Sequence, residues 1–188
     1  MQEYGSTSFG AFPGGGNGTP ESIVEQNAKQ AHFVNHSRLH IPVTFHYETL
    51  HGGGGGSTIF AMPCLQGATW DKELTGRVAR IIGMEAAANG GDRGFSPEIN
   101  VCTDPRFGRT EENFGEDPAL VSAMGAAAVK GLHGGNLEGP SGYLPKGTVV
   151  SEAKHAAAYG FGGKDGMAAD VSPRTLHDVR TQLNPSTT

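Results

Sequence analysis

Four side chains with the chemistry of a ligand site each follow a short apolar segment of the chain: Glu48, Arg109, Lys154 and His155. A carboxylate accepts hydrogen bonds, lysine and histidine donate them, and the planar fork of arginine donates in a geometry that lysine cannot match. Each hydroxyl of a polyol both donates and accepts. A carboxylate that meets several cationic donors therefore indicates a site for a polyhydroxylated ligand, and His51 could belong to it as well.

Each of these residues also has a structural explanation. Arg109 lies in the polar run 103–120, where it could pair with an acid of its own loop, namely Glu111, Glu112 or Glu116. Lys154 and His155 could mark a solvated strand end. Neighbouring strand residues face opposite ways, however, so two polar side chains there need either a bend or a site. Spacing alone leaves both explanations open.

The elements that must position these residues alternate along the chain. Residues 41–48, 97–102 and 148–153 are short apolar runs bounded by turn formers, which predicts three strands. Helices are predicted between and after them by apolar periodicity and by capping residues. The predicted helices cover residues 21–39, begin at the caps Asp71 and Asp117 and at Ser172-Pro173, and stop at Asn89-Gly90 and Gly134-Gly135.

This alternation predicts an α/β fold built from parallel βα units. The four side chains come just after the predicted strands. In a (β/α)8 barrel or a doubly wound sheet, the functional site lies at the carboxyl ends of the strands. The run 103–120 is then a βα loop that directs Arg109 into the site. Two phenylalanines in this polar run, Phe107 and Phe114, are expected to be buried.

Composition excludes several classes of function. The chain has 188 residues, enough for one ordinary domain, and its 30 glycines are clustered as in loops. A net charge of −5 without a basic stripe argues against nucleic acid as a partner. No apolar run is long enough for a membrane span, and no signal peptide follows Met1, so the compartment is left open.

Other motifs in the chain do not fit their usual chemistry. The HGGG at residues 51–54 resembles a lipase oxyanion loop, but no G-x-S-x-G is present. The histidines at 32, 36 and 40 have the spacing of metal ligands, yet the last one abuts Ile41-Pro42, where helix is disfavoured. Cys64 and Cys102 have no metal-site spacing. No metal site, and no cofactor such as a dinucleotide, is predicted.

Five segments in this order strongly resemble the N-terminal barrel of glycoside hydrolase family 3, the family of β-glucosidases and β-xylosidases. They are IPVTFHYETLHG, STIFAMPCLQGATWD, INVCTDPRFGRTEENFGEDPALV, AAVKGLHGG and SEAKHAAAYGFGG. The resemblance implies that Arg109, Lys154 and His155 bind the sugar in the −1 subsite, and that Glu48 binds sugar hydroxyls. β-Linked glucosides or small oligosaccharides are the implied ligands. Glu48 stands where many glucosidases of the family have Asp, which leaves glucoside and xyloside preference open.

The same resemblance implies a partial (β/α)8 barrel. Family members carry the nucleophilic aspartate further along the barrel and the acid/base glutamate on a second domain, so no catalytic residue is assigned within this chain. The expected organisation is a flexible lead-in over residues 1–20, the partial barrel over 21–179 and a tail unlike the family over 180–188.

The first hypothesis is therefore a fragment of a retaining exo-β-glycosidase of the β-glucosidase type. The fragment would be an enzyme by family but inactive by itself. A non-catalytic sugar-binding or vestigial fragment is the alternative, and β-xylosidase specificity is a further one. An unrelated α/β hydrolase that uses residues 51–54 is the weakest. Proteins of the resembled family are often secreted, periplasmic or vacuolar.

Overall fold

The computed structural model describes residues 11–13, 18–135, 144–161 and 170–182. Four short strands form one parallel sheet in the order β1-β2-β3-β4, which is also their order along the chain. The strands are β1 (Ala11–Pro13), β2 (Thr44–Tyr47), β3 (Arg93–Gly94) and β4 (Val150–Ser151). Parallel strands that pair in chain order, with helices between them, are the arrangement of a (β/α)8 barrel.

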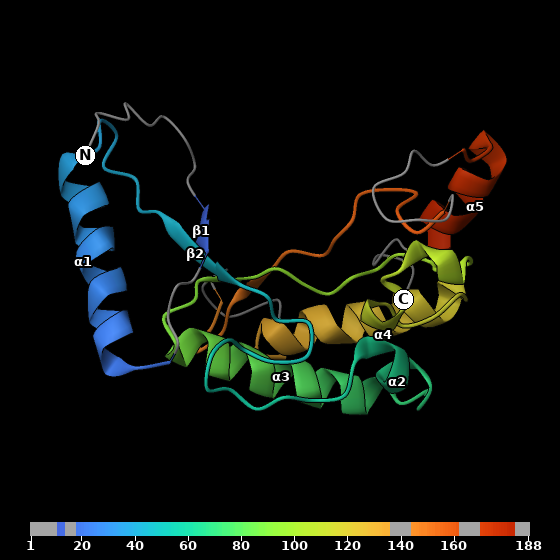
Figure 1. Ribbon diagram of the computed structural model, residues 1–188, viewed down its shortest axis with the longest axis horizontal. Coiled ribbons are helices and arrows are strands. Elements are labelled where there is room, and N and C mark those ends of the chain that lie inside the picture. The colour runs from blue at the N-terminus through green and yellow to red at the C-terminus, as the bar shows by residue number, and fades with distance from the viewer. Residues whose placement is uncertain (1–10, 14–17, 136–143, 162–169, 183–188) are drawn as a thin grey trace.

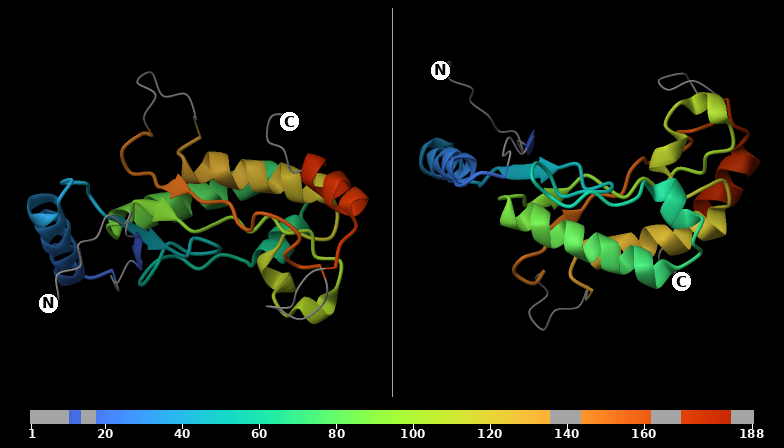
Figure 2. Two further views of the ribbon diagram at one scale, coloured as in Figure 1. Left: turned by 90° about the horizontal axis from the view of Figure 1, so that it is seen from above. Right: turned by 60° about the horizontal axis from the view of Figure 1, so that its bottom comes forward.

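Helices connect consecutive strands. Helix α1 (Pro20–His36) joins β1 to β2, α2 (Pro63–Gly67) and α3 (Lys72–Ala88) lie between β2 and β3, α4 (Pro118–Leu132) precedes β4, and α5 (Pro173–Gln182) follows it. Figures 1 and 2 show α3 and α4 running side by side, with α1 at one end of the molecule and α5 at the other. Among the described residues, no helix has both the length and the apolar character needed to cross a bilayer.

The predicted helices are confirmed, and local capping explains where they begin. The Asp71 carboxylate accepts a hydrogen bond from the Leu74 amide at 2.8 Å, and the Asp117 carboxylate accepts from two amides of the first turn of α4. Helix α3 ends at Ala88, Asn89 is its C-cap, and the next residue, Gly90, has a φ of 86°. That left-handed conformation suits glycine because no Cβ is present to clash.

Two parts of the predicted strand pattern were wrong. Strand β3 lies at Arg93–Gly94 and not at 97–102, where only Glu98 forms an isolated bridge, with Lys154. Pro97 has no N–H to donate, so a regular ladder cannot continue through this segment. Strand β1 lies within residues 1–20, which were expected to lack regular structure. Of the expected tail, residues 180–182 belong to α5, and residues 183–188 lie outside the described residues.

Apolar side chains of α3 and α4 form the core, which we call the apolar layer. Gly131 lets the two helices approach closely, since a side chain there would collide with the Gly76 carbonyl. Residues from the sheet and the loops complete the layer. Its buried members are Ala79, Ile82, Ala86, Val101, Phe114, Val121, Met124, Ala128, Leu132 and Val149.

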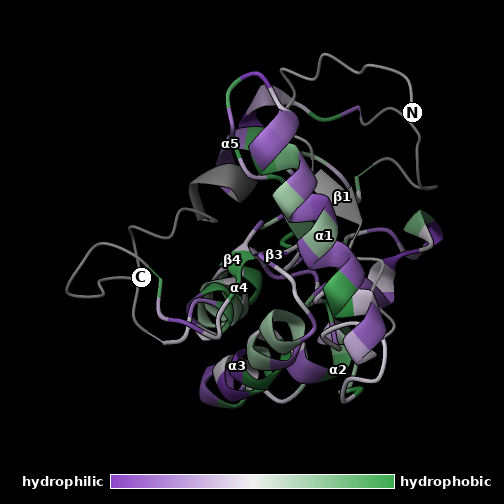
Figure 3. Ribbon diagram, turned by 90° about the vertical axis from the view of Figure 1, so that its left-hand side faces the viewer, coloured by the Kyte–Doolittle hydropathy of each residue, from purple (hydrophilic) through white to green (hydrophobic). Residues whose placement is uncertain are grey.

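Helix α1 is attached to the rest of the molecule by polar contacts. All residues of α1 are described, and Gln26 is the one that is buried. Its side-chain amide donates a hydrogen bond to the Tyr47 hydroxyl at 3.0 Å. The Gln30 side chain both donates to and accepts from the backbone of Val43, at 2.8 and 2.9 Å. Hydrophilic and hydrophobic residues are mixed along α1, whereas α4 is mostly hydrophobic (Figure 3).

Candidate functional site

The loop that follows β3 is folded by short helical turns. Two 3-10 turns, Pro105–Phe107 and Thr110–Glu112, flank Gly108, whose φ of 84° reverses the chain. Phe107 and Phe114 are both buried, as predicted. The end of α2 packs against this loop so closely that any side chain on Gly67 would collide with the Phe114 carbonyl. These turns and the close approach of α2 set the path of the loop that carries Arg109.

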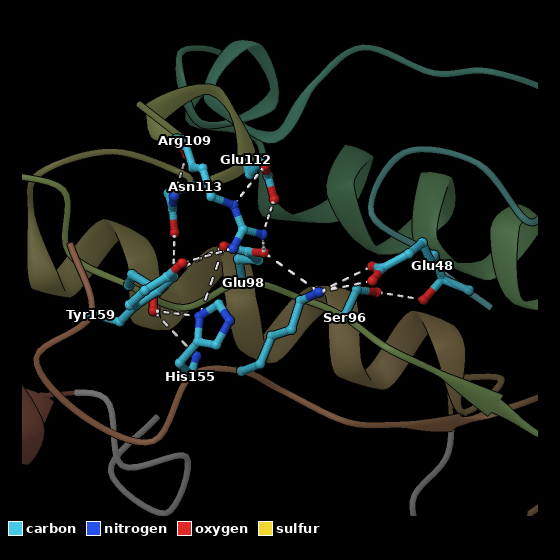
Figure 4. Close-up of polar contacts among 11 residues, drawn as sticks. Glu48, Ser96, Glu98, Arg109, Glu112, Asn113, His155 and Tyr159 are labelled. Atoms are coloured by element: carbon cyan, nitrogen blue, oxygen red, sulfur yellow. Dashed lines mark hydrogen bonds and ion pairs between the residues drawn. The ribbon is translucent and has the colours of Figure 1, made fainter. Parts of the chain in front are cut away.

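The four predicted residues meet around the side chain of Glu98 (Figure 4). Arg109 donates to the Glu98 carboxylate at 2.6 Å, and the Lys154 ammonium lies 3.5 Å from the same oxygen. His155 Nδ1 lies 4.0 Å from the other oxygen of Glu98. Glu48 reaches this group through Lys154, at 3.0 Å. We call Glu48, Glu98, Arg109, Glu112, Lys154 and His155 the ion cluster.

Most of the donors of Arg109 are used inside the protein. Its Nε and Nη2 form a fork on the Glu112 carboxylate at 2.9 and 2.6 Å. Nη2 also donates to Glu98, and Nη1 donates to the Tyr159 hydroxyl at 2.9 Å. A guanidinium has five N–H groups, so these four bonds leave one N–H on Nη1 without a partner among the described residues. The pairing of Arg109 inside its own loop and a ligand contact can therefore coexist.

Lys154 is shielded from water, while its partner Glu48 is open to it. Only 9% of the lysine side chain is exposed, compared with 63% of the Glu48 side chain. The ammonium also lies 4.1 Å from the centre of the Phe95 ring, a favourable cation–π distance. The site thus presents an exposed carboxylate beside a fixed ammonium.

The ring of His155 is held between an amide and an aromatic ring. Its Nδ1 lies 3.2 Å from the Asn100 amide oxygen, and its centroid lies 4.1 Å from that of Tyr159. Asn100 in turn donates to both Glu98 and Asn113, at 3.0 and 2.8 Å. These contacts orient the imidazole without covering it, because 31% of the His155 side chain stays exposed.

Besides His155, the ion cluster holds three carboxyl groups and two cations. Burial raises the pKa of Glu98 to about 7, and the hydrogen-bonded Glu112 carboxylate adds to the increase. The hydrogen bonds from Arg109 lower the pKa of Glu112 from its ordinary value. Near neutral pH, Glu98 is the carboxyl group of the two that gains and loses a proton.

Sequence reasoning found four members of this site and missed others. His51 does not join them, because its Nδ1 contacts the Phe60 carbonyl at 3.1 Å. Glu98 and Asn100 were passed over inside a run interpreted as an apolar strand. Their spacing of two residues, which places both side chains on one face of an extended segment, was the available signal. Tyr159 sits in a glycine-rich loop that offered no comparable signal.

Across the described residues, no three His, Cys, Asp or Glu side chains gather as metal ligands would. Both cysteines are free thiols. Burial is the main cause that raises the pKa of Cys102 to about 11, which makes this thiol a poor nucleophile near neutral pH. Within the described residues, the chemistry of the site is that of carboxylates, cations and amides.

Known proteins resemble this chain in sequence and in fold. Residues 9–184 match a family described as the glycosyl hydrolase family 3 N terminal domain. A β-xylosidase of Formosa agariphila is 36% identical over 151 residues, which are 76% of this chain and 20% of that protein. The structure resembles a β-glucosidase from Erythrobacter marinus with a TM-score of 0.76 and 31% identity, over 90% of this chain and 22% of that one.

A β-glucosidase from Listeria innocua, solved in complex with laminaribiose, has a TM-score of 0.71 and 29% identity. That similarity covers 86% of this chain and 23% of the other. The chain therefore spans about a fifth of the length of the proteins it resembles.

Proposed function

Because the chain belongs to glycoside hydrolase family 3, we propose that it supplies the sugar-binding side of the −1 subsite of a retaining exo-β-glycosidase. Glu48, Arg109, Lys154 and His155 are the residues that contact the sugar. The nucleophile and the acid/base come from outside these 188 residues, so the isolated chain binds the sugar without hydrolysing it. The ligands are β-linked glucosides or small oligosaccharides, in line with the laminaribiose complex of the Listeria innocua relative.

The observation that carries this proposal is that the four residues gather around Glu98 from three different segments. Arg109, Lys154 and His155 lie next to its carboxyl group, and Glu48 joins them through Lys154. Glu48 directly follows β2, Arg109 lies in the loop after β3, and Lys154 and His155 follow β4. A merely solvated strand end would not place its lysine at 9% exposure between two carboxylates. Such placement fits a preorganised set of donors and acceptors.

Each residue has a distinct part in holding a sugar. The exposed Glu48 carboxylate accepts from sugar hydroxyls, and the neighbouring Lys154 ammonium donates to the same or the next oxygen. The remaining Nη1 hydrogen of Arg109 and the exposed edge of His155 provide further contacts. The fork of Arg109 is occupied by Glu112, so its contribution is a single, fixed donor.

The carboxylates at the site are poorly suited to the catalytic steps. Retaining hydrolysis needs a nucleophile and an acid/base that face the scissile bond about 5 to 5.5 Å apart. Glu98 is fully buried, and Glu112 is clamped by Arg109. Glu48 is exposed but paired with Lys154. This supports binding without turnover by the chain alone.

Sugar binding is tested on the 188-residue chain by saturation-transfer NMR with D-glucose. Arg109→Lys keeps the charge but loses the planar fork, and Lys154→Met keeps the stem but loses the ammonium. Each should weaken binding by on the order of 2 kcal/mol, or about thirtyfold, because a site built for hydroxyls is left with unpaired groups. Asp117→Ala is the control, since it weakens a helix cap that is not part of the ion cluster. Unchanged binding in both site variants would remove these residues from the site.

Turnover is tested with a chromogenic β-glucoside. The purified chain should release no nitrophenol above background, because losing a member of the catalytic pair lowers kcat by many orders of magnitude. Nitrophenol release that copurifies with the protein would refute the hypothesis that the isolated chain is inactive. Glu48 would then be the first candidate for a catalytic carboxylate.

A preference for xylosides in the whole enzyme is the second candidate, favoured by the similarity to the Formosa agariphila β-xylosidase. D-Xylose lacks the hydroxymethyl group of D-glucose. Tighter binding of xylose than of glucose by the same chain would favour this candidate, and the reverse order would favour a glucosidase.

A further inference from the structure

Glu98 is the charged residue that the described part of the structure buries most completely, with 0% of its surface exposed. It cannot touch a sugar, yet every predicted sugar-binding residue contacts it directly or through one neighbour. The following inference rests on the proposed function, and it concerns what this buried carboxyl group does for that site.

Glu98 lies between the loop that carries Arg109 and the segment after β4, and it contacts both. Oε1 accepts a hydrogen bond from Arg109 Nη2 at 2.6 Å and lies 3.5 Å from Lys154 Nζ. Oε2 accepts from the Asn100 amide at 3.0 Å. A bridge between Glu98 and Lys154 also joins the backbones of the two segments, with Ile99 donating to the Lys154 carbonyl at 2.7 Å. The two cations are therefore placed relative to each other by one shared acceptor.

We propose that Glu98 is a positioning residue, which in its ionised form fixes Arg109 and Lys154 in the arrangement that binds the sugar. An ionised carboxylate attracts both cations at once. The alternative partner of Lys154 is Glu48, whose side chain is 63% exposed and therefore held less firmly.

Protonation of Glu98 releases this constraint. The neutral acid keeps its proton and donates a hydrogen bond to the Glu112 carboxylate, and it no longer carries the charge that attracts the ammonium of Lys154. Because burial raises the pKa of Glu98 to about 7, the change occurs between pH 6 and 8. Sugar affinity should then rise with pH through this range.

Titratable groups face Glu98 from its own segment and from two neighbouring ones. Arg109 and Glu112 face it from the loop after β3, Cys102 lies in its own segment, and Lys154 and His155 face it from the segment after β4. His155 is the group among these whose residue type also titrates near neutral pH. A test must therefore separate Glu98 from His155.

Glu98→Gln makes that separation. The amide has nearly the shape of the protonated acid, and its oxygen can accept from Arg109, whereas its NH2 group cannot accept from Asn100 as the carboxyl oxygen does. The variant is thus fixed in the state that the wild type adopts at low pH, and His155 is left intact. Glu111→Gln is the matched control, because Glu111 is an exposed acid next to Glu112 in the same loop.

The first measurement is the affinity of the 188-residue chain for D-glucose at pH 6 and pH 8. The ionised fraction of a group with a pKa of about 7 changes about tenfold over this range, so wild-type affinity should rise by up to about tenfold. Glu98→Gln should bind at the low-pH level at both values, and Glu111→Gln should follow the wild type. A pH dependence that survives in Glu98→Gln overturns the proposal.

The second measurement needs no sugar. The Nε–H signal of Arg109 in a 15N spectrum is assigned by its loss in Arg109→Lys. In the wild type it should shift with a midpoint near pH 7, and in Glu98→Gln it should not. A signal that titrates alike in both proteins, or in neither, overturns the role of Glu98. Titration in the wild type alone, without glucose binding at either pH, refutes the proposed function and leaves the link between Glu98 and Arg109 standing.

Discussion

The apolar layer and the ion cluster are both shielded from water, but opposite contacts hold them together. In the apolar layer, Ile82, Met124 and Leu132 from α3 and α4 are each at most 2% exposed and touch other hydrocarbon groups. Burial there removes apolar surface from water and stabilises the fold. In the ion cluster, Glu98 is fully buried beside a second carboxylate, and removing such charges from water costs free energy that pairing only partly offsets.

The apolar layer and the ion cluster are buried for different reasons. The apolar layer stabilises the fold, whereas the ion cluster costs free energy and, in the proposed function, places donors and acceptors for a sugar. Substitutions in the two regions should therefore move stability and sugar binding independently, and in some cases in opposite directions.

Leu132→Ala should give the largest effect. This side chain is 1% exposed within the apolar layer, and its truncation leaves a cavity. The free energy of unfolding in urea should fall by about 3 to 4 kcal/mol. Glucose affinity, measured where the variant is still folded, should stay unchanged. A parallel loss of affinity would show that the two regions are not independent.

Glu98→Gln should stabilise the protein at pH 8. The folded-state pKa of about 7 lies above the ordinary value of 4.5, so the folded protein keeps a proton that the unfolded chain releases between these values. Wild-type stability therefore falls as pH rises from about 4.5 to 7, and glutamine avoids this loss. The gain should approach about 2 to 3 kcal/mol at pH 8 and vanish below pH 4.

Urea unfolding of both proteins at the two pH values provides the measurement, with Glu111→Gln as the control that should show no such gain. A variant that is less stable than wild type at pH 8 would mean that the ion cluster contributes to folding in the same sense as the apolar layer.

Asp117→Ala should have a smaller effect, outside both regions. The carboxylate accepts hydrogen bonds from Ala119 and Leu120 at 2.7 and 3.0 Å, so its loss leaves amides of the first turn of α4 without a cap. Stability should fall by about 1 kcal/mol, with unchanged glucose affinity. Calorimetric melting and NMR titration check the two parts, and a change in affinity would contradict the separation of cap and site.

Arg106→Ala should have no measurable effect on melting temperature or on glucose affinity. Arg106 shares the loop of Arg109, but its side chain is 82% exposed and pairs only with Asp104 among the described residues. Exposed pairs of this kind contribute little because water screens them. A loss of binding would place Arg106 in the site, and a lowered melting temperature would show that the turn around Asp104 depends on it.

The fold was largely predictable because its helices begin with local signals. Asp71, Asp117 and Ser172-Pro173 each mark a helix start without reference to the rest of the chain. The predicted parallel βα fold, part of a (β/α)8 barrel, is confirmed by the sheet and by the structural relatives. The strand at 97–102 was wrong because apolar composition cannot show that Pro97 interrupts the hydrogen-bonded ladder.

The ion cluster was predictable only in part, since its contacts join distant positions. Arg109 and Lys154 have residue types that suggest chemistry by themselves. The burial of Glu98 depends on an arginine 11 residues away and on a lysine of the segment after β4. The Tyr159 hydroxyl meets an arginine 50 residues away. Such burial follows from the tertiary fold, which single-sequence patterns do not encode.

The polar attachment of α1 has a consequence for motion. Gln26 and Gln30 hold this helix through hydrogen bonds to Tyr47 and Val43, which water can replace at little net free energy when the helix moves away. Helix α1 can therefore open locally while α3 and α4 stay closed. In amide hydrogen exchange, its backbone should lose protection long before the apolar layer does, as an early step separate from global unfolding.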